Sequence, residues 1–206
     1  FSLKAFCAKN LLLTFKKSES FFIGKLIFLT RSLTRMLFLW NQPFLENSIL
    51  FNSDKSHIIA GIGSLTDIII PENVKSIGEY AFSGNQLKLV VFTDGVESIK
   101  NGAFSSNELR YVKLSESITE IGSFAFSHNN LDEIKFPKNL KFIGESAFDN
   151  NLLINIAIPP SVAHIGFRAF ENNKIESLEI LGDKLRFNRD WNDIGFPDSL
   201  KILPIQ

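Results

Sequence analysis

Apolar side chains recur along this chain with a period of 22 residues. The pair Ala-Phe occurs at 81–82, 103–104, 125–126, 147–148 and 169–170, and an isoleucine stands four residues before each alanine. Matching registers in all copies predict a repeat protein with one continuous interior. The predicted core of the array is the isoleucine and phenylalanine of each copy: Ile77, Phe82, Ile99, Phe104, Ile121, Phe126, Ile143, Phe148, Ile165 and Phe170.

Two local patterns alternate within each copy. The run Leu87-x-x-Val90-x-Phe92 places Val90 and Phe92 on one side of a short strand. The stretch Ile-Gly-x-x-Ala-Phe places isoleucine and alanine four residues apart, which predicts a short helical turn. We therefore expect an α/β repeat solenoid, a right-handed coil with one short parallel β-strand and one short helical turn per 22-residue repeat.

The small alanine allows neighbouring coils to approach closely, so the five phenylalanines can stack as an internal ladder. One copy has too little apolar surface to fold alone, and stability has to come from burial against the next copy. The repeat pattern therefore predicts strands of successive coils joined by hydrogen bonds.

The repeat resembles a known family. The segment IPENVKSIGEYAFSGNQLKLVVF, residues 70–92, resembles the BspA-like leucine-rich repeat, as do the later copies. The resemblance implies a solenoid fold, exposure at microbial cell surfaces, and binding of host proteins or other cells. Many members carry a cysteine shortly after Ala-Phe, where this chain has Asn85, Asn107, Asn129, Asn151 and Asn173. These asparagines either bond to backbone of adjoining coils or are ordinary turn residues.

Two segments with different composition divide the chain. Residues 58–206 carry the repeat array, whereas residues 1–57 share none of the pattern and hold eight basic against three acidic side chains. We expect residues 1–57 to be poorly ordered or loosely capping. The apolar stretch 21–40 contains Lys25, Arg31 and Arg35, which favours weak contact with a membrane surface over a spanning helix. At its other end the array becomes degenerate, which fits either a terminal cap or a fragment of a longer array.

Composition excludes several functions. Basic and acidic residues number 22 each, so the chain lacks the excess of cations that nucleic acid binding requires. The single cysteine, Cys7, lies outside the array, and His57, His128 and His164 occupy different repeat positions. We therefore expect no metal site, no cofactor, no small-molecule substrate and no enzymatic activity.

The remaining candidate for function is the outer face of the strands. Side chains pointing away from the core form columns, with one residue per copy, and these columns vary while the core stays constant. The candidate binding residues are Ile69, Leu89, Val91, Tyr111, Lys113, Glu133 and Lys135. The apolar members lie at the N-terminal end of the columns, where they are either an interaction patch or covered by residues 36–57.

These observations predict a non-enzymatic module that binds proteins or mediates adhesion through its strand face. The family resemblance places such a module on a microbial cell surface or in the secreted fraction. The alternatives are an intracellular scaffold or regulator, and the repeat fragment of a larger protein whose other parts include a catalytic domain.

Overall fold

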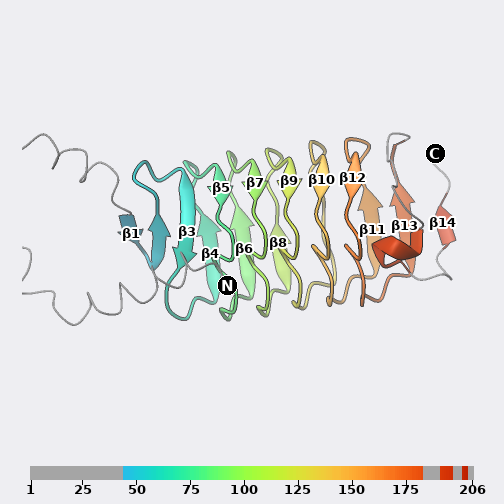
Figure 1. Ribbon diagram of the computed structural model, residues 1–206, viewed down its shortest axis with the longest axis horizontal. Coiled ribbons are helices and arrows are strands. Elements are labelled where there is room, and N and C mark those ends of the chain that lie inside the picture. Colours follow the sequence, from blue (N-terminus) through green and yellow to red (C-terminus); the bar gives the residue numbers. More distant parts are fainter. Residues whose placement is uncertain (1–43, 183–190, 197–200, 204–206) are drawn as a thin grey trace, which may run out of the picture.

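The chain folds into a row of stacked coils. The computed structural model describes residues 44–182, 191–196 and 201–203. In these residues the coils lie side by side along one axis (Figure 1), and within the array the strands of neighbouring repeats pair in parallel with partners 22 residues apart. The predicted parallel solenoid is therefore confirmed. The expectations for Cys7 and for residues 21–40 fall outside the described residues.

The isoleucines of the repeat lie in one long sheet. Within the described residues this sheet has eight strands, and Ile77 pairs with Ile99, as Ile99 does with Ile121. Its parallel part consists of β3 (His57–Gly61), β5 (Ser76–Ile77), β7 (Ser98–Ile99), β9 (Glu120–Ile121), β10 (Phe142–Ile143) and β12 (His164–Ile165).

The Val90 and Phe92 positions lie on the other side of each coil, in strands that form two separate sheets. One sheet contains β4 (Asp67–Ile70), β6 (Leu89–Phe92) and β8 (Tyr111–Lys113), and the other contains β11 (Asn155–Ile158), β13 (Ser177–Ile180) and β14 (Lys201–Leu203). Between β8 and β11, the segment 132–136 of the third coil forms no strand.

The interior contains the apolar side chains that recur at each period. The isoleucine, alanine and phenylalanine of all five copies are buried. The five phenylalanine rings stack nearly parallel, with centroids 5.2 to 5.6 Å apart from Phe82 to Phe170. Stacked aromatic pairs of this kind contribute about 1 kcal/mol each beyond the area that they bury.

The predicted helical turn is wrong. Each isoleucine belongs to a second short strand, and the Ala-Phe segment that follows is a run of tight turns. Two positions per copy have left-handed backbone, which a right-handed helix cannot contain. The first is Tyr80, Gly102, Phe124, Ser146 and Arg168, and the second is Gly84, Ser106, His128, Asn150 and Asn172.

Hydrogen bonds between coils take the place of the helical ones. The amide of Tyr80 donates to the carbonyl of Asn101 at 2.9 Å, and that of Phe82 donates to the carbonyl of Ala103 at 2.8 Å. Equivalent bonds recur along the array, such as Phe126 to Ala147. The turns are therefore held by the next coil, which explains why the local sequence does not determine their shape.

The asparagines after Ala-Phe form an internal ladder. Asn129 donates through Nδ2 to the carbonyl of Phe104, one coil back, at 3.0 Å and to that of Phe126 at 3.1 Å. Its Oδ1 accepts the amide of Leu109 at 3.0 Å. Asn107, Asn151 and Asn173 repeat this pattern. The structure thus decides in favour of the ladder rather than ordinary turn residues.

Irregular elements flank the array at both ends of its described part. Strands β1 (Phe44–Glu46) and β2 (Ile49–Phe51) form an antiparallel hairpin that pairs with β3, and Ile49, Leu50 and Phe51 are buried. At the other end, a 3-10 helix η1 (Trp191–Ile194) precedes Phe196, whose ring stacks on Phe170 at 5.2 Å. The phenylalanine ladder therefore extends one coil beyond the last Ala-Phe pair.

Candidate binding face

The strand face consists of the outward side chains of β4, β6 and β8, the irregular segment of the third coil, and β11 and β13. Alternation along each strand separates the two sides, because neighbouring side chains point in opposite directions. In β4, Ile68 and Ile70 are buried, whereas Ile69 is 66% exposed. In β8, Val112 is buried and Tyr111 is 55% exposed. The face therefore presents large side chains to solvent.

The apolar end of this face contains Ile69, Leu89, Val91 and Tyr111. Leu89 and Val91 are half-buried, and their strand pairs with β4 on one side and with β8 on the other. The hairpin of β1 and β2 leaves Ile69 exposed, and a cleft of about 530 Å³ lies between them. Of the predicted covering segment 36–57, residues 36–43 lie outside the described residues.

Glu133 and Lys135 lie on the third coil, away from any strand. Lys135 Nζ lies 3.4 Å from Glu133 Oε1, and the two side chains are 90% and 69% exposed. Clefts flank this segment on both sides. The one toward β8, about 350 Å³ in volume, is lined by Tyr111 and Lys113, and the one toward β11, about 490 Å³, by Ile154 and Ala157.

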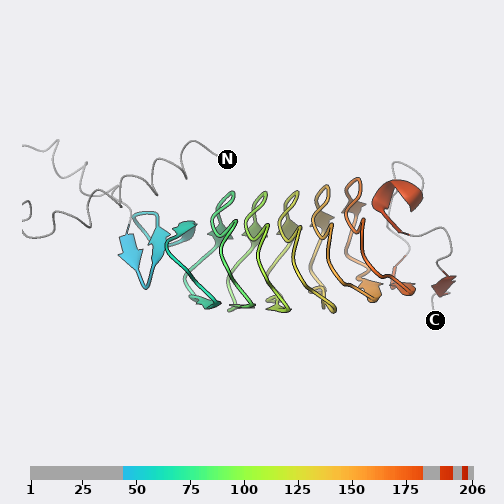
Figure 2. The ribbon, with the colours of Figure 1, turned by 90° about the horizontal axis from the view of Figure 1, so that it is seen from below.

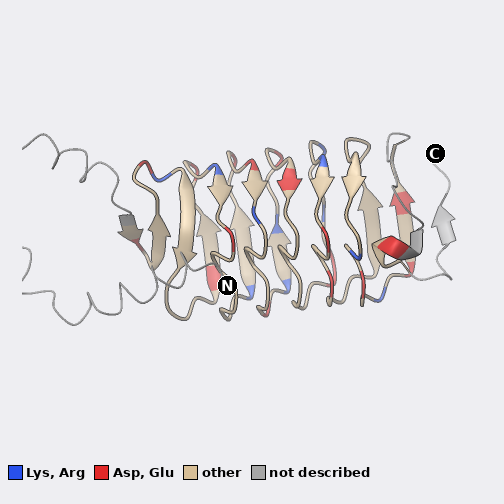
Figure 3. Cartoon of the chain, in the orientation of Figure 1, with Lys and Arg blue, Asp and Glu red and all other residues tan. Residues whose placement is uncertain are grey.

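Charge is unevenly distributed over the strand face. Lys88 and Arg110 lie directly before β6 and β8, and Lys113 is the last residue of β8. Glu176 lies directly before β13, and Glu179 lies within it. Figure 3 shows blue segments near β6 and β8 and red segments on β13. The sequence interpretation missed Lys88, Arg110 and Glu176. These residues share one repeat position, directly before each strand, and this position could have been read from the sequence as a further exposed column.

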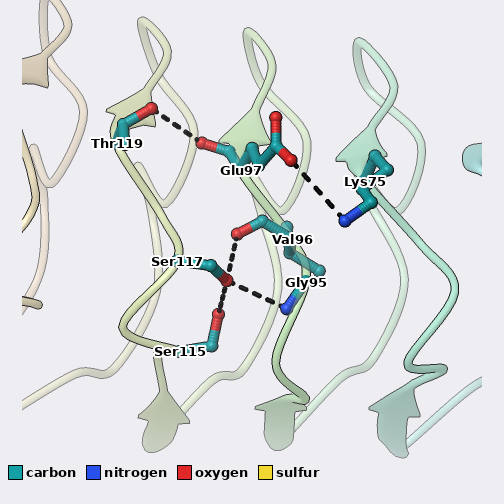
Figure 4. Close-up of polar contacts among 7 residues, drawn as sticks. All are labelled: Lys75, Gly95, Val96, Glu97, Ser115, Ser117 and Thr119. Atoms are coloured by element: carbon teal, nitrogen blue, oxygen red, sulfur yellow. Dashed lines mark hydrogen bonds and ion pairs between the residues drawn. The ribbon is translucent and has the colours of Figure 1, made fainter.

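A polar corner holds the strands of the face in position. Beyond β6 and β8, Ser117 Oγ accepts the amide of Gly95 at 3.0 Å and donates to the carbonyl of Val96 at 2.8 Å (Figure 4). Ser115 bonds to the same hydroxyl at 2.8 Å. Asn139 and Ser161, at the same repeat position as Ser117, also donate to carbonyls of the preceding coil.

The other side of this corner is tied by weaker surface contacts. Thr119 donates to the carbonyl of Glu97 at 3.2 Å, and Lys75 Nζ lies 3.6 Å from the carboxylate of Glu97 (Figure 4). Exposed ion pairs of this kind contribute at most about 1 kcal/mol. The corner is therefore held mainly by hydrogen bonds to the backbone.

The structure brings few reactive side chains together. In the described part of the chain, no group of three His, Cys, Asp or Glu residues could hold a metal ion. His57 contacts Ser56, while His164 stacks on Phe142 with ring centroids 4.9 Å apart. The hydroxyl of Ser56 donates to Asp54 Oδ1, with 2.5 Å between the oxygens. This bond and the one from the Ser56 amide hold the pKa of Asp54 below its ordinary value. These contacts fix an exposed turn.

Within the described residues, the chain forms no helix with the length and apolar character that crossing a membrane requires. Residues 21–40 lie outside that part of the chain.

Comparison with protein families assigns the array. The sequence matches the BspA type leucine-rich repeat region in six copies over residues 55–180, which is more than half of the chain. The chain belongs to the BspA-type leucine-rich repeat family. The resemblance seen in the repeat motif is thereby confirmed. Proteins of this family with solenoid folds are typically non-enzymatic and bind other proteins.

Solved structures of bacterial leucine-rich repeat proteins are similar to this BspA-type chain. The pneumococcal vaccine antigen PcpA has a TM-score of 0.66 at 20% identity, covering 79% of this chain and 42% of its own. A leucine-rich repeat protein from Eubacterium ventriosum has a TM-score of 0.51 at 25% identity, covering 66% and 42%. The chain thus spans less than half the length of either protein. No curated protein matches the sequence.

Proposed function

We propose that this chain is a non-enzymatic binding module, displayed on a microbial cell surface, that engages proteins through its strand face. The observation that carries the proposal is the contrast between a constant, fully buried core and an outer strand column that differs in every copy. Tyr111 is 55% exposed within that column. Exposed tyrosines supply much of the energy at protein interfaces, because they bury large area at little entropic cost.

The surrounding residues fit the same role. Lys113, Glu133 and Lys135 provide exposed charges beside Tyr111, and charges at the rim of an interface set the association rate and the choice of partner. The clefts on either side of the third coil offer concave surface for a partner's side chains. Because the coils are held by repeated backbone bonds, the face is a rigid scaffold that loses little entropy on binding.

Photo-crosslinking tests the binding face directly. A photoreactive phenylalanine analogue placed at Tyr111, in the chain expressed in its source cells, should form adducts with protein. The same analogue at Lys141, an exposed residue directly before β10 on the opposite side of the coil, provides the matched control. A lower yield of adduct from Tyr111 when Lys113→Glu is also present would support binding through the strand face. Equal adduct formation from both positions would contradict it.

Surface display is tested separately. Protease added to intact cells should cleave the chain as fast as it does in a lysate. Cleavage in the lysate alone would place the module inside the cell and would favour a scaffold or regulator.

A further inference from the structure

We propose that the strand face pairs with the same face of a second copy of this chain. This inference rests on the proposed function, because it uses the same face, and it names the partner. The two copies would be related by a two-fold axis parallel to the strands, passing over the third coil at residues 132–136. A two-fold interface requires one surface to be complementary to itself when turned around. Three properties of the face favour such pairing on either side of the axis, where Glu133 and Lys135 would face their own copies.

The first property is the position of the charges. Lys88, Arg110 and Lys113 lie on the first and second coils, whereas Glu176 and Glu179 lie on the fifth. Among the described residues, no ion pair involves any of these five side chains. Reversing the order of the coils places Lys88 opposite Glu176 of the second copy, with Lys113 one coil away from its Glu179. Both ends of the face would then gain attraction between opposite charges.

The second property is the shape of the centre. The third coil forms no strand, and a cleft lies on each side of it, toward β8 and toward β11. The two-fold axis brings Tyr111 of one copy over the cleft beside Ile154 and Ala157 of the other. Ile154 is 37% exposed, so this contact would bury apolar surface on both copies. The same contact forms twice in the dimer.

The third property is the straightness of the array. Figure 2 shows the coils in a nearly straight row, with the outer segments of successive coils at a similar level. Two such faces can contact each other along their whole length. Four residues per strand at about 3.3 Å and five coils at about 4.8 Å give a face of roughly 13 by 24 Å. This is roughly 300 Å² per copy, or about 600 Å² for the pair, which is below the roughly 1,200 Å² of standard specific complexes, so we expect a weak dimer with a dissociation constant on the order of 100 μM.

Charge-reversal variants of the full chain test this arrangement. Lys88→Glu with Lys113→Glu makes both ends of the face acidic, and Glu176→Lys with Glu179→Lys makes both ends basic. Sedimentation velocity from about 1 to 300 μM should show a dimer in the wild type. Each variant alone should associate at least about tenfold more weakly, because like charges then meet. An equimolar mixture of the two should recover association.

Lys141→Glu, directly before β10 on the opposite side of the coil, is the control and should leave the dimer unchanged. Circular dichroism and the unfolding midpoint of each variant show whether the fold is intact, and the recovered mixture excludes misfolding as the cause of any loss. Association should also weaken as salt screens the charges.

Three results would overturn the inference: a wild type that stays monomeric throughout, variants that associate like the wild type, or a mixture that fails to recover. If the chain is monomeric but still crosslinks to other proteins from Tyr111, the dimer proposal is contradicted and the proposed function stands. A chain that neither dimerises nor crosslinks from Tyr111 would remove both.

Discussion

At the scale of single residues, the contribution of a side chain to stability depends on its position in the array as well as on its type. The asparagines after Ala-Phe are identical in sequence, yet they differ in bonding. Asn129 satisfies backbone groups of its own coil and of the coil before it. In the first copy, Asn85 Nδ2 is buried and has no hydrogen-bond partner among the described residues. The regular ladder thus begins only at the second copy.

This difference predicts unequal effects of the same substitution. Asn129→Ala should lower the free energy of unfolding by about 3 kcal/mol, because it leaves buried backbone groups without partners. Asn85→Ala should cost under about 1 kcal/mol, since its amide nitrogen makes no bond to lose. Urea denaturation of both variants measures the difference. Equal losses would mean that the ladder does not stabilise the array through these bonds.

At the scale of the element, the repeat could be predicted from sequence and the turn could not. The period, the buried isoleucines and phenylalanines, and the strand alternation all follow from apolar spacing. The Ile-to-Ala spacing of four residues is compatible with a helical turn as well as with the tight turns observed. Only the left-handed backbone at residues such as Tyr80 and Phe124 excludes the helix. Such residues carry no local signal, because bonds to the next coil impose their conformation. The candidate face was predictable as columns, but the loss of the third strand was not.

The left-handed turn positions make a direct prediction. Gly84 has φ of 66° and nothing within 4 Å of an added Cβ, so Gly84→Ala introduces backbone strain without a clash. We expect a loss of about 1 kcal/mol in unfolding free energy. At the equivalent position in the next coil, Ser106 has φ of 55° and an exposed side chain. Ser106→Gly should therefore stabilise the protein, by up to about 1 kcal/mol.

Thermal and urea unfolding of the two variants check these signs. A destabilising Ser106→Gly, together with a neutral Gly84→Ala, would show that these turns are not left-handed in solution.

At the scale of the whole molecule, every coil depends on its neighbours. Strand pairing, the stacked phenylalanines, the asparagine ladder and the serine corner all join one coil to the next, at separations of 20 to 25 residues along the chain. Stability in such an array is approximately a sum of terms between adjacent repeats. The same regularity makes the strand face rigid, and its exposed columns can differ from copy to copy without altering the core.

The central claim is that coils of 22 residues stack at a constant spacing, and spin-label distances test it most directly. With Cys7 replaced by serine, one label is placed at Gln86 and the second at Asn130, Leu152 or Lys174, which are exposed and occupy the same repeat position. In a stacked solenoid, the mean distance should grow by about 5 Å for each coil between the labels. Distances that fail to increase in equal steps would contradict the stacked solenoid.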